Sequence, residues 1–454
     1  MGQIGRNLSL WSWAILLLIL PFAFLPSIFL GFALFLILFL VAARRWAYGH
    51  FLPPTPLNLA LLLLLGSLLL SSLVMFDGSL SLPKLTGIVI GIALYFSVVQ
   101  YSKERSLWPI VITYLFFGVS IAMVGLFGTE WPSPFTFLNT ASELLPLKRL
   151  GIPGTAAGVI NLNELAGVLC WVAPLLLAFS IGLRRRLIHQ SLVLYVLLLA
   201  GTLFTIFLLF ATSSRGGIFA FSVGALLIAA LNVTNKWKMA LGFVPILAMI
   251  IILIFFRNQA DNDIVGDALG LTGRVEIWSR ALLVLQDFPL TGVSVNGFRQ
   301  VVHELYALFE ISGDVDIAHA HNHLLQVGLD LGLPGMISYL ALWILSGGLL
   351  LATLRNLIHR GGNHHPYYIL AVGLAGSLLA GWVFGVFDTV ALGARPGFMW
   401  WLLIGMTVAV HYEVCFSGKH LRVYRRVRRD RLSKRVQGDD SHASTGPDLP
   451  GQSA

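Results

Sequence analysis

Charged residues are scarce in this chain of 454 residues, where Asp, Glu, Lys and Arg together make up 11% against 57% hydrophobic residues. That balance, with a mean hydropathy of +0.82, excludes an ordinary soluble domain and is typical of a membrane protein. Only two cysteines are present, Cys170 and Cys415, so a disulfide framework and a thiolate metal site are excluded. The sequence has no internal repeat, no Walker A loop and no dinucleotide fingerprint, which argues against nucleotide-driven chemistry.

Long apolar runs recur from Leu10 onward, and each approaches the 20 or so residues that a helix needs to cross a bilayer. The alternation typical of a membrane barrel is missing, so we predict an all-α polytopic protein. The first run, 10–43, is too long for a cleavable signal peptide, and Pro21 and Pro26 favour a hairpin of two short helices. Twelve spans are predicted in all, the other ten near residues 57–75, 85–101, 107–127, 157–182, 189–211, 217–232, 238–256, 324–353, 366–387 and 396–412.

The distribution of basic residues predicts the orientation. With a cytoplasmic amino terminus, most Lys and Arg fall in cytoplasmic segments, including those between Lys419 and Arg435. Because positive residues resist translocation, both termini are predicted inside and the loop at 257–323 outside. We expect a transmembrane domain over 1–418, which contains this extracytoplasmic loop, and a tail over 419–454 that is basic and then disordered. We interpret the basic part as contacting membrane lipids, not nucleic acid.

The outer loop contains the stretch GRVEIWSRALLVLQDFP, which predicts an amphipathic helix on the membrane surface. Thr272 is expected to cap it, which leaves Arg274 in its first turn. A cation is unfavourable there unless an anion binds, and a guanidinium beside a helix amino terminus suits a phosphate group. The alternative is that Arg274 reaches toward lipid headgroups. The residues predicted to share the apolar face are Val275, Trp278, Leu282 and Leu285.

The stretch FATSSRGGIFAF repeats this arrangement. Ser213 or Ser214 can cap a helix beginning near Gly216, which puts Arg215 at its outer end. Gly216 and Gly217 would let a ligand approach the backbone. A single arginine at a membrane boundary is also a common interfacial anchor. Two arginines at outer helix starts, in a chain that keeps basic residues inside, favour an anionic ligand.

A third outer helix start, near Leu324, is preceded by the histidine-rich stretch AHAHNH. A histidine held at a helix amino terminus tends to stay neutral and can act as a general base. Metal binding is an alternative: the stretch lacks a clear carboxylate or thiolate partner, but Asp314 and Asp316 are near in sequence and keep this alternative open. The three histidines are His319, His321 and His323. Another alternative, above all for His319 and His323, is that they are structural polar residues at the membrane interface.

His321 and Asn322, followed after nine residues by Gly332-Leu-Pro-Gly335, resemble the signature of the O-antigen ligase and O-antigen polymerase superfamily. The superfamily also includes protein O-oligosaccharyltransferases. GRVEIW, SSRGG and NLNELAG, residues 161–167, resemble its other recurring pieces in the same order, so the resemblance extends over nearly the whole chain. One departure is PLTGVSVNGF, which has few glycines where family members are often glycine-rich.

The resemblance implies an inner-membrane glycosyltransferase of GT-C-like architecture that uses a glycan on polyprenyl (undecaprenyl) diphosphate at the outer face. The acceptor is a hydroxyl of a lipid-linked glycan or of a protein. Carried over by motif, His321 activates the acceptor, and Arg215 and Arg274 hold the diphosphate. We expect direct displacement with inversion and with no cofactor or metal. The residues expected to support the site are Asn322, His319 and Asn163.

Three alternatives stay open at this stage. Within the superfamily, polysaccharide polymerase or protein O-oligosaccharyltransferase activity differs from ligase activity chiefly in the acceptor. A multispan transporter is the main alternative of another class, but transporters use ionisable groups inside their spans, and here those are nearly absent apart from Glu164. An interaction scaffold would explain neither arginine.

Overall fold

The computed structural model describes residues 2–19, 28–144, 159–232, 271–312, 315–362 and 365–417, and every regular element in these ranges is helical. The predicted span 238–256, Pro21, Pro26, Asp314 and the tail 419–454 lie outside the described residues. The elements are α1 (Gly2–Ile19), α2 (Ile28–Tyr48), α3 (Asn58–Ser72), α4 (Gly78–Glu104), α5 (Trp108–Gly128), η2 (Phe135–Leu138), α6 (Asn139–Leu144), α7 (Leu162–Gly182), α8 (Arg184–Gln190), α9 (Leu192–Ala211), α10 (Arg215–Asn232), α12 (Leu271–Asp287), α13 (Phe298–Leu305), α14 (His323–His359), α15 (Pro366–Phe387), η5 (Arg395–Gly397), α16 (Phe398–Tyr412) and η6 (Glu413–Ser417).

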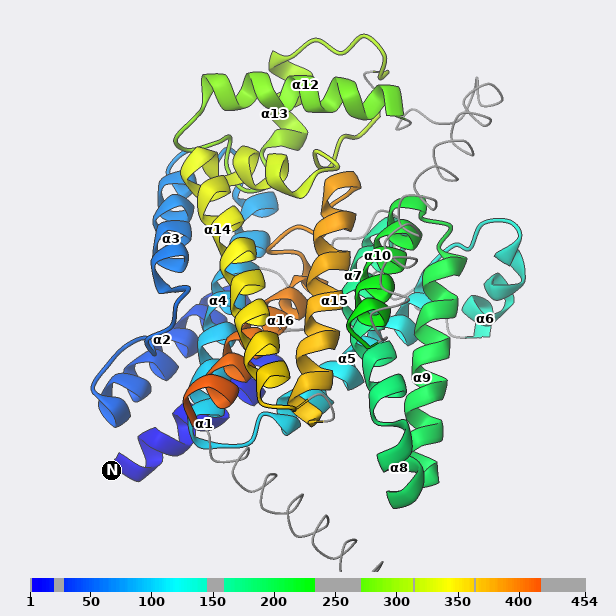
Figure 1. Cartoon of the computed structure of the whole chain (residues 1–454). Helices are drawn as coiled ribbons and strands as arrows, with labels where there is room; N and C mark the ends of the chain where they lie inside the picture. The colour runs from blue at the N-terminus through cyan, green and yellow to red at the C-terminus, as the bar shows by residue number, and fades with distance from the viewer. Residues whose placement is uncertain are drawn as a thin grey trace, which may run out of the picture.

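The long helices form one bundle, and α12 lies across one end of it (Figure 1). Within the bundle, α15 packs against α7 and α10, α16 packs against α4, and α14 packs against α3. The first apolar run forms two helices, α1 and α2, that pack on each other, as the predicted hairpin requires. We refer to the end of the bundle beneath α12 as the α12 end.

Nine helices within the described ranges are long and apolar enough to cross a membrane. The predicted span at 57–75 is shorter than expected, because α3 has 15 residues and reaches only about 22 Å. Leucine and phenylalanine side chains on peripheral helices, such as Phe116 on α5 and Leu197 on α9, are 67% and 63% exposed. Apolar exposure of this extent suits lipid and not water. The chain is therefore a polytopic helical membrane protein.

The predicted span 324–353 is one part of a longer helix, α14, which breaks at Gly332. Gly332 has φ +72°, outside the helical region, and Pro334 follows it. The break leaves backbone groups without helical partners, and the loop after α12 supplies them. Leu333 donates its N–H to the carbonyl of Pro289 at 2.7 Å, and Val293 donates to the carbonyl of Leu329 at 2.7 Å. The GLPG sequence thus docks this loop onto α14.

Replacing Gly332 by alanine should destabilise the protein, because the new Cβ would lie 2.4 Å from the carbonyl carbon and oxygen of Leu290. Positive φ adds roughly 1–2 kcal/mol of strain for a residue with a Cβ. Gly348→Ala, in the same helix but with open space around it, is the matched control and should be neutral or slightly stabilising. The test is the thermal unfolding midpoint of the solubilised variants, and equal midpoints would contradict this account.

Residues 271–312 and 315–320, which we call the cap, have a small core of their own. It contains Ile277, Ala281 and Val284 of α12, packed with Phe298 and Val302 of α13. The predicted apolar face of α12 is buried only in part: Leu285 is 6% exposed, whereas Val275 and Leu282 are more than half exposed. α12 carries two apolar stripes, and the stripe offset from the predicted one is buried by the cap. The prediction that Thr272 is the N-cap of α12 is wrong, because the helix already includes the preceding residue, Leu271.

Candidate functional site

Three segments far apart in sequence meet at the α12 end around the carboxylate of Asp388. His319 Nε2 and His321 Nδ1 lie 3.1 Å and 3.2 Å from Asp388 Oδ1. Arg274, in the first turn of α12, lies 4.0 Å from the other carboxylate oxygen. The two imidazole rings are 4.3 Å apart between centroids. A carboxylate, two imidazoles and a guanidinium thus form one cluster.

The histidine loop is held by side chains on both sides of His321. Trp278 donates its indole N–H to the carbonyl of Ala320 at 2.9 Å, and the N–H of Ala320 is bound by Gln326 at 2.8 Å. Asn322 caps α14 by accepting hydrogen bonds from the N–H groups of Leu324 and Leu325. Between these two fixed points, His321 adopts φ +48°. This backbone conformation is rare for histidine and is typical of residues held for function.

Asp388 ends α15 and is almost fully buried. Its Oδ1 also accepts the N–H of Thr389 at 2.8 Å. Burial alone would raise the pKa of this carboxyl, but hydrogen bonds from His319 and His321 outweigh burial and hold the pKa well below its usual range. In the neutral tautomer that donates Nδ1–H to this carboxylate, His321 keeps its free lone pair on Nε2.

Arg274 is positioned by α15 and retains unused donor capacity. Its Nη1 donates to the carbonyl of Phe387 at 2.6 Å. Its buried Nε has no hydrogen-bond partner among the described residues, and neither has Asp388 Oδ2. Unpartnered buried polar atoms are costly and mark places where a ligand completes the structure. An anion beside Arg274 and a hydroxyl donor beside Asp388 would satisfy both atoms.

Arg215 is the first residue of α10, and the start of that helix lies against the end of α15. A Cβ on Gly216 would lie 3.2 Å from the Cβ of Phe387, the residue whose carbonyl binds Arg274. A Cβ on Gly217 would lie 2.9 Å from Ala166. Both glycines allow close helix packing, and the approach of a ligand to their backbone stays a prediction. Their packing places Arg215 and Arg274 on helices that both contact Phe387.

The NLNELAG stretch contributes a different residue from the one predicted. Asn161 caps α7 by accepting from the N–H groups of Asn163 and Glu164. None of the hydrogen bonds between described residues joins the Asn163 side chain to the histidine loop. Glu164 instead interacts electrostatically with His319 and with two cations, Lys84 and Arg395. The acidic residue of this stretch therefore lies near the site.

His323 lies apart from this cluster, inside the bundle. Its ring packs edge-on against Tyr339, Trp343 and Trp382, with the Tyr339 hydroxyl 3.2 Å from Nδ1. The interpretation of His323 as a structural residue agrees with this aromatic enclosure. His319 differs from that interpretation, because it shares the carboxylate of Asp388 with His321.

Within the described residues, His319, His321 and Asp388 form the group that is able to hold a metal ion, with ligand atoms within 4.8 Å of one another. A zinc ion would need contacts of about 2.0–2.2 Å to each ligand and would replace both histidine–aspartate hydrogen bonds. It would also lie beside the Arg274 guanidinium, whose charge opposes a cation. The donor set thus suits direct hydrogen bonding better than a divalent cation.

Another residue of the GRVEIW stretch, Glu276, has a structural role in the cap. Glu276 is buried and accepts hydrogen bonds from the N–H groups of residues 309, 310 and 311 at 2.6, 2.9 and 3.0 Å. Arg280, one turn along α12, pairs with it. Burial would raise the pKa of Glu276, but these backbone donors and Arg280 lower it below its ordinary value of 4.5. The carboxylate therefore fixes the turn after α13.

Replacing Glu276 by glutamine should loosen this turn, because a neutral amide accepts backbone hydrogen bonds more weakly than a carboxylate. Loss of about 2 kcal/mol would raise amide hydrogen exchange at residues 309–311 roughly 30-fold. The stabilisation is present above the unfolded glutamate pKa and is lost as pH falls through the lower folded value. Glu310→Gln, in the same turn but exposed, is the control; equal exchange in both variants would disprove the role of Glu276.

Sequence reasoning missed Asp388, the residue around which the cluster is built. A signal was present, since Asp388 is an acidic residue directly after an apolar span in a chain with few charges. An ionisable residue at such a position is a functional candidate by default. Gln326, which fixes the histidine loop, carries no comparable signal because a single glutamine in a helix is common.

The fold and the cluster together define a polytopic membrane protein with a histidine–aspartate–arginine site at one end of its bundle. Residues 200–340 match the family model described as O-Antigen ligase, Wzy_C. This segment is similar to the O-antigen ligase family, and the match is consistent with O-antigen ligase or polymerase type activity on lipid-linked glycans. The matched segment contains Arg215, Arg274 and the histidine loop, whereas Asn163 and Asp388 lie outside it. A search of curated proteins found no match.

Proposed function

We propose that this protein transfers a glycan from a polyprenyl diphosphate, undecaprenyl diphosphate in bacteria, to a hydroxyl acceptor. The reaction takes place at the outer face of the inner membrane, in a twelve-span protein of GT-C-like architecture with both termini in the cytoplasm. The observation that carries the proposal is the arrangement of His321, Asp388 and Arg274. It puts a base with a free nitrogen next to a cation with an unused donor.

In the proposed reaction, His321 Nε2 removes the proton of the acceptor hydroxyl as its oxygen attacks the anomeric carbon of the donor. The bond from that carbon to the diphosphate oxygen breaks, and the diphosphate leaves with the electron pair. Asp388 stabilises the imidazolium that forms, while Arg274 and Arg215 neutralise the charge that develops on the leaving group. A single displacement inverts the anomeric configuration. With two guanidinium groups in this role, no metal is needed.

The supporting residues have defined places in this scheme. Asn322 caps α14 and donates to the carbonyl of Val386 at 3.2 Å, which ties the histidine loop to the end of α15. His319 shares Asp388 with His321 and limits how that carboxylate can rotate. Asn163 acts, in this proposal, through the helix start that it shares with Glu164. O-antigen ligation is the preferred reaction; polymerisation or protein glycosylation would use the same site with another acceptor.

The test is reconstitution of transfer with the purified full-length protein, a lipid-linked glycan extracted from the source cells and a panel of acceptors. The panel contains lipid A–core, an unextended lipid-linked glycan and a serine-containing protein acceptor, each with and without EDTA. Transfer in EDTA supports the metal-independent mechanism, and the acceptor consumed distinguishes the three activities. Loss of transfer in EDTA, restored by one divalent cation, would overturn metal independence. Glycan uptake into vesicles without any transfer would favour a transporter.

A further inference from the structure

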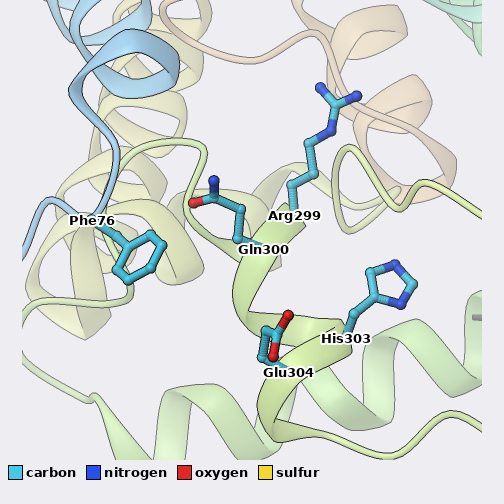
Figure 2. A pocket seen from close by; sticks show the side chains of 5 residues that line it. All are labelled: Phe76, Arg299, Gln300, His303 and Glu304. Atoms are coloured by element: carbon cyan, nitrogen blue, oxygen red, sulfur yellow. The ribbon is translucent and has the colours of Figure 1, made fainter.

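A pocket outside the catalytic cluster lies between α13 of the cap and the connection from α3 to α4. It has a volume of about 630 Å³ and is lined by Phe76, Arg299, Gln300, His303 and Glu304. This volume is within the usual range for small-molecule sites. Figure 2 shows Phe76 on the connection, facing the helix from which the other four side chains project. None of these residues has a part in the proposed transfer reaction.

The pocket follows from the amphipathic pattern of α13. Phe298 and Val302 are almost fully buried in the core of the cap. The polar residues at positions 299, 300, 303 and 304 recur on the other side of the helix and form one wall. The helix is therefore held by its apolar face and presents a guanidinium, an amide, an imidazole and a carboxylate together.

Both walls are fixed in place by the residues beside them. Arg299 pairs with Asp316, its Nε donating to Oδ1 at 2.6 Å. Asp77 caps α4 through the N–H of Ser79 at 2.8 Å and so anchors the turn that presents Phe76. The pKa of Asp77 is lowered chiefly by its hydrogen bonds from Ser79. The turn that carries Phe76 and the helix that carries Arg299 are thus each held by a neighbouring carboxylate.

The chemistry of this wall matches a sugar ring. A pyranose has an apolar face of C–H groups, which packs on an aromatic ring, and a rim of hydroxyls that both donate and accept hydrogen bonds. Phe76 is 80% exposed and supplies the aromatic surface. The four polar side chains of α13 supply donors and acceptors in planar groups. A phosphate would not suit this wall, because Glu304 and Asp77 lie on it or beside it.

The pocket is also close to the transfer site. Asp316, the partner of Arg299, precedes His319 by three residues, a distance of about 10 Å at full extension. Lys84, on α4 below the connection, binds the Asn296 side chain at 2.5 Å, just before α13 begins. A glycan chain whose end is at His321 can therefore reach the pocket with its neighbouring sugars.

We propose that this pocket is a saccharide subsite that binds the sugar chain of one of the two substrates at a distance from the reacting bond. Phe76 stacks on a ring, and Gln300, His303 and Glu304 hydrogen-bond to its hydroxyls. The inference rests on the proposed glycan transfer, but binding at the subsite requires neither the diphosphate nor catalysis. The donor chain and the acceptor chain share this chemistry, so the test treats them separately.

The experiment measures binding to the full-length protein by saturation-transfer NMR. One probe is the oligosaccharide released from the donor by mild acid, which lacks lipid and diphosphate; the other is the delipidated acceptor glycan. We expect one of them to bind the wild type and the His321→Ala variant equally. Phe76→Ala and Gln300→Ala should each weaken binding roughly tenfold. Phe137→Ala, which removes another exposed aromatic far along the chain, should leave it unchanged.

The outcomes separate this inference from the proposed function. Binding by one glycan, weakened by the pocket variants, supports the subsite and identifies which substrate uses it. If the wild type transfers glycan but binds neither probe at millimolar concentration, the subsite is disproved while the function stands. If a probe binds but the pocket variants match the wild type, the pocket is not where it binds. In that case Phe76 is an aromatic residue of the membrane interface, an alternative that predicts no change in glycan binding by Phe76→Ala.

Discussion

Replacing His321 by alanine should lower the rate of glycan transfer roughly 10²–10⁴-fold, the range that a general base contributes. His321 is the histidine assigned as the base: when its Nδ1 donates to Asp388, Nε2 has a lone pair available to a substrate hydroxyl. Donor binding should change little, because the diphosphate contacts assigned to Arg215 and Arg274 stay in place. The measurement is the single-turnover transfer rate at saturating donor and acceptor, with membrane levels of the variant checked by immunoblot.

Two companion variants distinguish a catalytic from a structural effect. His319→Ala removes one hydrogen bond to the same carboxylate and should cost about tenfold at most. Asp388→Asn should cost more, since it removes the charge that stabilises the imidazolium. If His321 and Asp388 act as a unit, adding Asp388→Asn to His321→Ala should cause no further loss. Full transfer activity of a stable His321→Ala protein would remove the base from the mechanism.

The second large effect is expected from the two arginines. Arg274→Ala should lower kcat/KM for the donor roughly 10²–10³-fold, the usual cost of removing a donor that stabilises developing negative charge. Arg215→Ala should act in the same direction. Lysine at either position should restore only part of the activity, because it retains the charge but lacks the planar fork. The measurement is transfer at varied donor concentration, with thermal stability recorded for each variant.

The control for this series is Arg105→Ala, an exposed arginine at the opposite end of α4 from the cap. It should leave donor kinetics unchanged. Arg274 also binds the carbonyl of Phe387, so a loss of stability in Arg274→Ala would complicate its result. Arg215→Ala is then the second test of the diphosphate role, and its own thermal stability is compared with that of the wild type. Wild-type donor kinetics in both single variants would exclude the diphosphate role.

Local patterns predicted the parts of the site that lie at helix starts. Arg274, Arg215 and His321 each follow or precede a recognisable helix boundary, and the structure puts two of them in one cluster and the third on the helix beside it. Such boundaries are set by capping and by apolar periodicity, which a single segment contains. Residues that are brought together only by tertiary contacts were harder to predict from the sequence. Asp388 is separated from its histidine partners by 69 and 67 residues in sequence, and no local sequence pattern indicates a contact over such a separation.

The face of α12 illustrates a different limit. Two apolar stripes run along this helix, and the sequence does not say which one another element will cover. The predicted stripe includes Val275 and Leu282, yet the cap core uses Ile277, Ala281 and Val284. The choice depends on α13 and on the loop that docks at Gly332. Ser294 and Asn296 of that loop adopt φ +73° and +67°, so two residues with side chains occupy left-handed positions there.

Three consecutive residues at the end of α15 receive the contacts of the catalytic cluster. Val386 accepts from Asn322, Phe387 accepts from Arg274, and Asp388 binds both histidines. Since adjacent residues are covalently linked, a change in bilayer thickness that tilts or slides α15 carries these three attachment points together. A displacement of this helix end therefore moves the partners of His319, His321 and Arg274 as one unit.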